Sequence, residues 1–140
     1  MDSIVFMQIN CQKSKVGSAD VTEYVSKMSS NNKEYLFLLQ EPNSNKGKIF
    51  HLPKRNLYFN KAARPADRVR TAILSSQGLD IWPHLEYTNN DVTTVVLKRD
   101  SFPKEIFIIS AYFDINGGIP EILERALVHC NSKQIPHIWW

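Results

Sequence analysis

The sequence lacks the features that mark secreted, membrane-spanning or disulfide-bonded proteins. Only two of its 140 residues are cysteines, too few for a disulfide scaffold or a self-contained zinc site. No apolar run reaches the roughly 20 residues that cross a bilayer. The apolar N-terminus has neither a basic leader nor a small-residue cleavage site. We therefore expect an intracellular protein, nuclear or cytoplasmic, that is not secreted and has no membrane partner, with Cys11 as a packing thiol.

The sequence also lacks nucleotide-binding loops and a large excess of charge. Neither G-x-G-x-x-G nor G-x-x-x-x-G-K-[ST] occurs, so the common dinucleotide and nucleoside-triphosphate motifs are excluded. Seventeen Lys and Arg against 14 Asp and Glu give a net charge of +3 and a pI near 8.9. This balance mildly favours a polyanionic partner, but an ordinary solvated surface accounts for it equally well.

What is present fits one globular domain over residues 1–140. A chain of this length can bury roughly two-thirds of the surface that its unfolded form exposes. The content of 43% hydrophobic and 22% charged residues is ordinary for a folded protein. We find no internal repeat, low-complexity tract or linker, and we expect no second domain.

Apolar patterning predicts many short strands and two helices. Three long, nearly continuous apolar runs are typical of strands buried on both faces: 4–9, 35–41 and 105–113. Shorter strands are expected at 56–59, 71–74, 80–83 (an edge strand), 92–97 and 136–140. One helix is expected to begin with Ser18 as its N-cap and to stop at 29–33, and a second to span 119–131, with Pro120 in its first turn. Strands that outnumber helices indicate a layered α/β (α+β) fold.

The sequence ends inside the apolar run 136–140. Domains seldom end within such a strand, because the sheet edge and both tryptophan rings would lack cover. We therefore expect a truncated domain; a final strand paired in the middle of a sheet is the alternative. Alternating rings on a strand are typical of core residues, so we expect Trp139 and Trp140 to be buried.

Polar residues end the three long strands: Asn10, Glu41, and Tyr112 with Asp114. In layered α/β enzymes, functional groups project from strand ends onto one rim. Glu41, between an apolar strand and Pro42, suits a rigid oxygen ligand for Mg²⁺. Each residue also has a structural alternative: Glu41 as a charge at the strand's exit to water, Asn10 as a turn former and Tyr112 as a core tyrosine.

The order of these residues resembles the endonuclease/exonuclease/phosphatase superfamily of deoxyribonuclease I and the apurinic endonucleases. It is most similar to the endonuclease domain of non-LTR retrotransposon open reading frames. The segments that carry the resemblance are 7–14 (MQINCQKS), 38–42 (LLQEP), 70–74 (RTAIL) and 109–114 (ISAYFD). The resemblance covers essentially the whole chain but only the first part of that family's domain. It implies a partial four-layer α/β/β/α sandwich of the deoxyribonuclease I type, truncated before its second half is complete.

The resemblance implies a role for each matched residue. Asn10 matches the asparagine that helps to organise the metal and the attacking water, and Glu41 the glutamate that ligates the metal. Tyr112 matches the tyrosine that contacts the scissile phosphate, and Asp114 takes a supporting role. The implied cofactor is Mg²⁺ or Mn²⁺, with Glu41 and Asn10 as ligands. The implied partners are DNA and a covalently linked reverse transcriptase domain.

A basic cluster, Lys61, Arg64, Arg68 and Arg70, suits contact with DNA phosphates. The alternative is a solvated basic loop, since Asp67 offsets part of its charge.

The chain departs from the family in two motifs. No Asp-x-Asn follows the strand expected at 136–140, and Ser-Asp-His is absent. These motifs supply the groups that activate water, and a missing general base costs about 10²–10⁴-fold in rate. We therefore expect this chain to be inactive by itself.

Three interpretations follow. The first is the N-terminal portion of a Mg²⁺-dependent DNA endonuclease that nicks target DNA for retrotransposition. The second is a catalytically inactive, degenerate fragment or a weak DNA-binding module. The third is a phosphatase or phosphodiesterase of the same superfamily. The sequence leaves the oligomeric state open.

Overall fold

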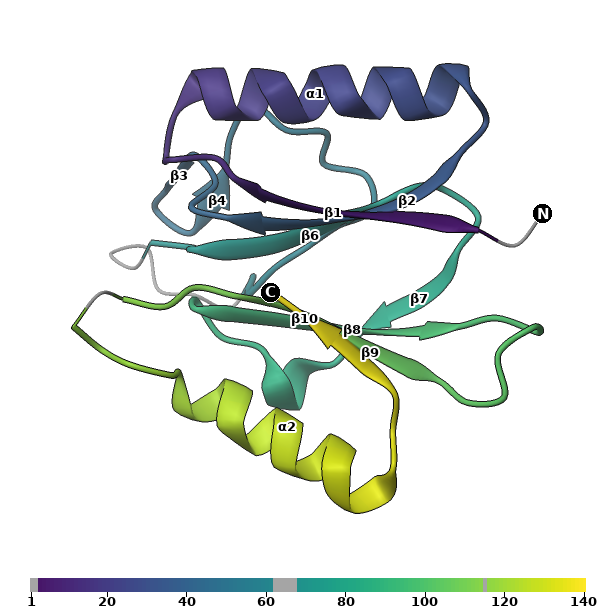
Figure 1. Ribbon diagram of the computed structural model, residues 1–140. Helices are drawn as coiled ribbons and strands as arrows, with labels where there is room; N and C mark the ends of the chain where they lie inside the picture. The colour runs from purple at the N-terminus through teal and green to yellow at the C-terminus, as the bar shows by residue number, and fades with distance from the viewer. Residues whose placement is uncertain (1–2, 62–67, 115) are drawn as a thin grey trace.

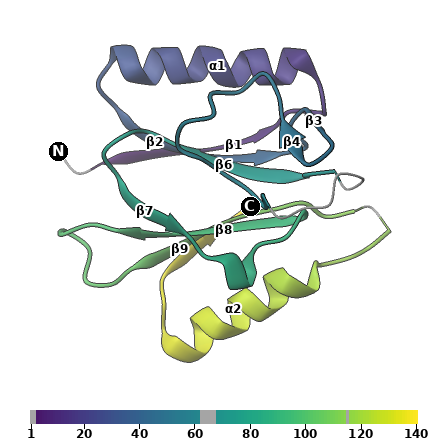
Figure 2. The ribbon, with the colours of Figure 1, turned by 180° about the vertical axis from the view of Figure 1, so that it is seen from behind.

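The computed structural model describes residues 3–61, 68–114 and 116–140. Two four-stranded sheets lie face to face, and one helix covers the outer face of each sheet (Figure 1). The same four layers are seen from behind in Figure 2. Their order, helix, sheet, sheet, helix, confirms the α/β/β/α layering predicted from the sequence.

The first sheet lies under helix α1 (Lys15–Ser30) and has the strand order β1-β2-β6-β5. Its strands are β1 (Ile4–Asn10), β2 (Glu34–Gln40), β5 (Leu57–Tyr58) and β6 (Thr71–Ser75). β1 and β2 are parallel because α1 returns the chain between them, whereas β6 is antiparallel to β2 and to β5. A small hairpin of β3 (Ser44–Asn45) and β4 (Lys48–Ile49) lies between β2 and β5 in the chain.

The second sheet lies over helix α2 (Glu121–Lys133) and has the order β10-β9-β8-β7. Its strands are β7 (Asp80–Pro83), β8 (Val92–Lys98), β9 (Ile106–Ala111) and β10 (His137–Trp139). β10 is parallel to β9 because α2 connects them, and the other pairs are antiparallel. A short 3₁₀ helix, η1 (Leu85–Tyr87), precedes β8. β7 is an edge strand, as its proline predicted.

β2 is buried along nearly its whole length, which confirms the prediction from its unbroken apolar run. Successive side chains of a strand point to opposite faces. Leu38 accordingly packs between the two sheets with Val95, and Phe37 packs under α1 with Val21. A third apolar cluster joins β9 to α2. Burial of these three clusters holds the four layers together.

One end of the interface between the sheets is polar. Gln40 is paired with Thr71 in the first sheet, Thr93 is paired with Ser110 in the second, and all four side chains are buried. Gln40 Nε2 donates a hydrogen bond of 3.0 Å to Ser110 Oγ, and the Thr71 and Thr93 hydroxyls are 2.9 Å apart. These contacts link the two sheets at the end where β2 and β9 finish.

Both helices begin at residues other than those predicted. α1 begins at Lys15 because Ser14 is its N-cap, accepting a 3.0 Å hydrogen bond from the Gly17 N–H. Ser18, the predicted cap, is buried inside the helix. Pro120 lies at the N-cap of α2 rather than in its first turn. Neither helix, nor any other in the part of the chain described, is long and apolar enough to cross a membrane.

The prediction that the first strand is buried on both faces is wrong. β1 is the edge of its sheet, and its side chains alternate between partly buried and exposed, with Phe6 38% exposed. A continuous apolar run does not distinguish a central strand from an edge strand, because the fold decides which neighbours a strand receives.

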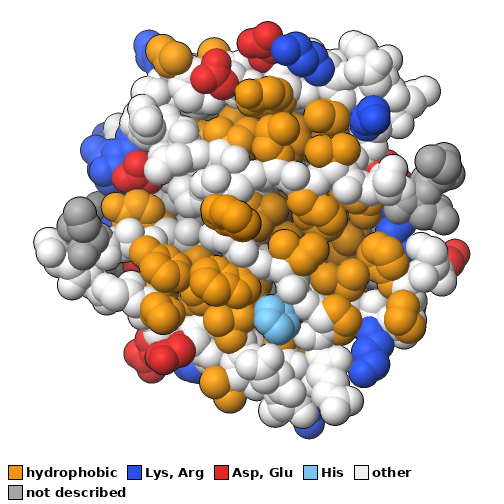
Figure 3. Space-filling view, viewed as in Figure 1, with side chains coloured by type: hydrophobic (Ala, Val, Ile, Leu, Met, Phe, Trp, Pro, Cys, Tyr) orange, Lys and Arg blue, Asp and Glu red, His pale blue; other side chains and the backbone are white. Residues whose placement is uncertain are grey.

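The prediction that both terminal tryptophans are buried is also wrong. β10 is the edge of the second sheet, and Trp139 and Trp140 are 40% and 66% exposed. The Trp139 ring stacks on Phe113, with centroids 6.1 Å apart. Apolar side chains gather on this face of the molecule, as Figure 3 shows. The Trp139 and Phe113 rings therefore pack on each other at the surface and not in the core.

Candidate functional site

β1 and β2 are parallel and end at the same edge of the first sheet. Their register places Asn10 beside Gln40, so Asn10 lies next to the strand position that precedes Glu41. Asn10 Oδ1 accepts a 2.9 Å hydrogen bond from the backbone N–H of Gln12. This contact holds the amide within the turn that follows β1, where it is exposed.

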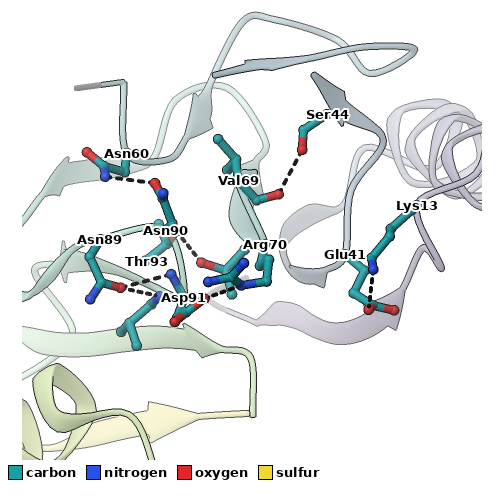
Figure 4. Close-up of polar contacts among 12 residues, drawn as sticks. Lys13, Glu41, Ser44, Asn60, Val69, Arg70, Asn89, Asn90, Asp91 and Thr93 are labelled. Atoms are coloured by element: carbon teal, nitrogen blue, oxygen red, sulfur yellow. Dashed lines mark hydrogen bonds and ion pairs between the residues drawn. The ribbon is translucent and has the colours of Figure 1, made fainter. Parts of the chain in front are cut away.

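Glu41 lies in a bend directly after β2. Its φ of 50° is in the left-handed region, which residues with side chains rarely adopt. The bend is fixed because the Glu41 N–H donates to the Arg70 carbonyl at 2.8 Å and the Glu41 carbonyl accepts from the Lys13 N–H at 2.7 Å. The carboxylate also lies 3.7 Å from Lys13 Nζ (Figure 4). The surrounding hydrogen bonds therefore hold Glu41 in a backbone conformation that is unfavourable for a residue with a side chain.

Tyr112 reaches Glu41 from the second sheet. It directly follows β9, and its N–H donates to the Asp91 carbonyl at 2.8 Å. Its side chain lies close enough to Glu41 for the carboxylate to affect its pKa. Burial, reinforced by the negative charges of Glu41 and Asp114, raises the pKa of Tyr112, so the hydroxyl stays protonated at neutral pH. The structure thus brings Glu41 and Tyr112 together, with Asn10 at the neighbouring strand end.

An ion pair that we did not predict adjoins Tyr112. Arg70, just before β6, is paired through Nε with Asp91, just before β8 (Figure 4). The hydrogen bond to Asp91 raises the pKa of Arg70. Arg70 Cζ lies 5.7 Å from the centre of the Tyr112 ring. The sequence did not indicate a role for Asp91 at the site, because the run Asn89, Asn90, Asp91 is typical of a turn.

Of the other predicted site residues, Asp114 acts on this centre through its charge. Asp114 is exposed, accepts a 3.2 Å hydrogen bond from the Asn116 N–H, and contributes its charge to the raised pKa of Tyr112. Lys61 and Arg68 are exposed. Arg64 lies outside the described residues. Within the predicted basic cluster, Arg70 is the described residue whose cation lies over Tyr112.

The oxygen donors at this edge suit a hard cation. The described residues contain no group of three or more His, Cys, Asp or Glu side chains that could hold a metal ion. The Glu41 carboxylate and the Asn10 amide oxygen remain. Mg²⁺ keeps several waters and needs only one or two protein carboxylates. Glu41 and Asn10 are therefore the residues that would hold such an ion if one binds at this edge.

Cys11 follows Asn10 and is fully buried, which confirms the prediction of a packing thiol. Burial, with a contribution from the charge of Asp20, raises the pKa of Cys11 from 9.0 to about 11. Because the pKa of Cys11 is raised in the folded state, the neutral thiol contributes to the free energy of unfolding. This contribution is complete below pH 9 and is lost as the pH rises toward 11.

We expect the Cys11 thiol to be unreactive at pH 8. The thiolate is the reacting form, and a pKa rise of two units lowers its fraction about 100-fold relative to an ordinary thiol. A Cys130→Ala variant leaves Cys11 as the single thiol, and its reaction with the disulfide reagent DTNB measures the rate. Urea unfolding should abolish the protection. A folded variant that reacts as fast as glutathione would contradict this burial.

No family model matches the sequence, and no curated protein matches it. Among solved structures, it is similar to the endonuclease domain of TRAS1, a telomere-specific non-LTR retrotransposon. That match has a TM-score of 0.65 and 22% identity and covers 94% of this chain. It covers 55% of the TRAS1 chain, so the present chain spans about half of that length. The chain therefore has the deoxyribonuclease I-like fold of a non-LTR retrotransposon endonuclease domain, as its resemblance predicted.

Proposed function

We propose that this chain is the N-terminal portion of a Mg²⁺-dependent DNA endonuclease domain that nicks target DNA. The observation that carries the proposal is the proximity of Glu41 and Tyr112, which follow strands of different sheets, with Asn10 at the adjacent strand end. The fold shared with the TRAS1 endonuclease domain supports it. In the whole protein, residues 1–140 belong to a single endonuclease domain that is linked to a reverse transcriptase domain.

Each residue of the site has a separate role in binding a phosphodiester. Glu41 and Asn10 would hold Mg²⁺, which when bound would supply Lewis-acid stabilisation of charge on the phosphate. The protonated hydroxyl of Tyr112 donates a hydrogen bond to a phosphate oxygen. Arg70 places a positive charge over the Tyr112 ring, and its pairing with Asp91 keeps the guanidinium in position. These residues bind and orient the substrate.

A second candidate function is DNA binding without cleavage. It is favoured by the chemistry of the residues described at the site: Asn10, Tyr112 and Arg70 can bind and orient a phosphodiester, and Glu41 is assigned to the metal, which leaves no general base among these four. A site that binds and orients but lacks its general base loses about 10²–10⁴-fold in rate. Metal binding at Glu41 is common to both candidates, and cleavage separates them.

Metal binding by the 140-residue chain tests the site. In a Mn²⁺ titration followed by electron paramagnetic resonance, we expect Glu41→Gln to weaken binding at least tenfold, because the variant loses the single carboxylate ligand. Glu86→Gln removes an exposed carboxylate from η1 and is the matched control. Equal Mn²⁺ binding by the wild type and Glu41→Gln would refute the assignment of the metal site.

A plasmid assay separates the two functions. Supercoiled DNA is incubated with Mg²⁺ and one of two proteins. One is the 140-residue chain, and the other is a longer chain that includes the residues encoded downstream. Open-circular product that is lost in both Glu41→Gln and Tyr112→Phe supports the endonuclease. Metal and DNA binding without product from either form supports the binding module.

A further inference from the structure

Positive charge is concentrated in one segment of the chain. Residues 42–61 contain five Lys and Arg and no Asp or Glu, whereas the whole chain has a net charge of only +3. The remaining residues are therefore net negative. This segment contains the short strands β3, β4 and β5.

The structure gathers three of these cations around a groove of about 310 Å³. Lys48, Lys54 and Lys61 line it together with Phe50 and Phe59. The three lysines are exposed, and none of them is in an ion pair within the described ranges. Lys61 Nζ lies 5.9 Å from the centre of the Phe59 ring, and Phe50 is 43% exposed. We call these five residues the lysine groove.

The lysine groove is connected to the Glu41–Tyr112 site. Asn60, beside Lys61 in the chain, donates a 3.0 Å hydrogen bond from Nδ2 to Asn90 Oδ1. The Asn90 carbonyl in turn accepts from the Arg70 N–H at 2.8 Å, as Figure 4 shows. A chain of direct contacts therefore runs from the groove to the cation over Tyr112.

We propose that the lysine groove binds a sugar–phosphate strand of the DNA on which the Glu41–Tyr112 site acts. The lysines pair with successive phosphates, and the two rings contact sugars or an unpaired base. Lysines without an ion pair in the described ranges, beside one exposed and one partly buried ring, match this chemistry, since phosphates need charge and bases need flat apolar surfaces. The inference deepens the proposed function, on which it rests for the identity of the ligand as DNA.

Fluorescence anisotropy with a labelled 20-base-pair duplex, and with one of its strands alone, tests the proposal in EDTA over a range of NaCl concentrations. We expect Lys48→Gln/Lys54→Gln/Lys61→Gln to lower the affinity at least tenfold. The slope of log K against log[NaCl] should fall by about 2.7 for duplex DNA if each lysine contacts one phosphate. Lys27→Gln/Lys33→Gln/Lys133→Gln removes the same charge from exposed positions on and after the helices and is the matched control.

Phe50→Ala identifies the form of DNA that is bound. A loss of about fivefold or more for the single strand, with little change for the duplex, indicates stacking on an unpaired base. Equal small changes for both indicate contact with the sugars of a duplex. Either outcome keeps the groove as a DNA-binding surface.

Three results would overturn the lysine groove. They are a wild type that does not bind DNA at low salt, equal losses in the two triple variants, and a groove variant that loses binding to phosphatidylserine vesicles but not to DNA. Because EDTA removes the metal, these results do not depend on Glu41. Mn²⁺ binding that is lost in Glu41→Gln would still support the proposed site if the groove failed, and the groove could stand if that site failed.

Discussion

Replacing Phe37 with alanine is expected to lower the free energy of unfolding by about 4 kcal/mol. Phe37 is fully buried in β2, and its ring stacks on Tyr35 with centroids 4.7 Å apart. The substitution removes the ring and leaves a cavity under α1. Val21 and Leu74 belong to the same buried cluster, and a packed cluster relaxes only partly into such a space. Urea unfolding followed by far-ultraviolet circular dichroism measures the loss.

Phe6→Ala is the control for the Phe37 substitution. It removes the same side chain from the edge strand β1, where 38% of Phe6 is already exposed. We expect its effect to be less than half as large, because less apolar surface leaves water when that strand folds. Equal losses from the two variants would show that β2 is not the centre of the sandwich.

Gly17→Ala is expected to destabilise the chain by about 3 kcal/mol, at the upper end for an overpacked site. Helix propensity predicts the opposite sign, because alanine is about 1 kcal/mol better than glycine inside a helix. A Cβ at Gly17 would lie 2.2 Å from the Cys11 carbonyl oxygen and 2.7 Å from the Cys11 Cα. These are backbone atoms, so α1 must move away from the turn that follows Asn10.

Two measurements check the Gly17 substitution. Urea unfolding gives the change in stability, and Ala19→Gly, at an exposed position in the same helix, measures propensity alone. DTNB reaction at Cys11 reports movement of the turn, and we expect it to become faster. A Gly17→Ala variant as stable as the wild type, with Cys11 still protected, would mean that α1 does not approach the turn so closely.

The sequence predicted most of the strands, because apolar runs bounded by polar residues reflect burial directly. The strands expected at 35–41, 71–74 and 92–97 correspond to β2, β6 and β8. The position of a strand within its sheet was harder to predict. β1 and β10 are edges because of the chain's connections, and no local pattern records that. The two-residue strands β3 and β4 are too short to show alternation.

The residues of the candidate site were predictable where a strand end exposes them. Asn10, Glu41 and Tyr112 each follow an apolar run, so their positions were visible although their roles remain predictions. Asp91 was not visible, because its importance depends on Arg70, which lies 21 residues away in the chain. Gln40 was also missed: it lies one residue before Glu41 and is buried against Ser110 of the other sheet. Such pairings are decided by tertiary contact and not by local pattern.

Glu41 and Tyr112 stand on different sheets, and this has a consequence for how the molecule would fail. Their separation is set by how tightly the two halves of the sandwich close, since no single strand carries both groups. Slight loosening of that closure on warming would part the carboxylate from the phenol while each ladder of backbone hydrogen bonds stayed intact. We therefore expect the two side chains to move apart before the regular secondary structure is lost, so that their separation reports how closely the two sheets pack.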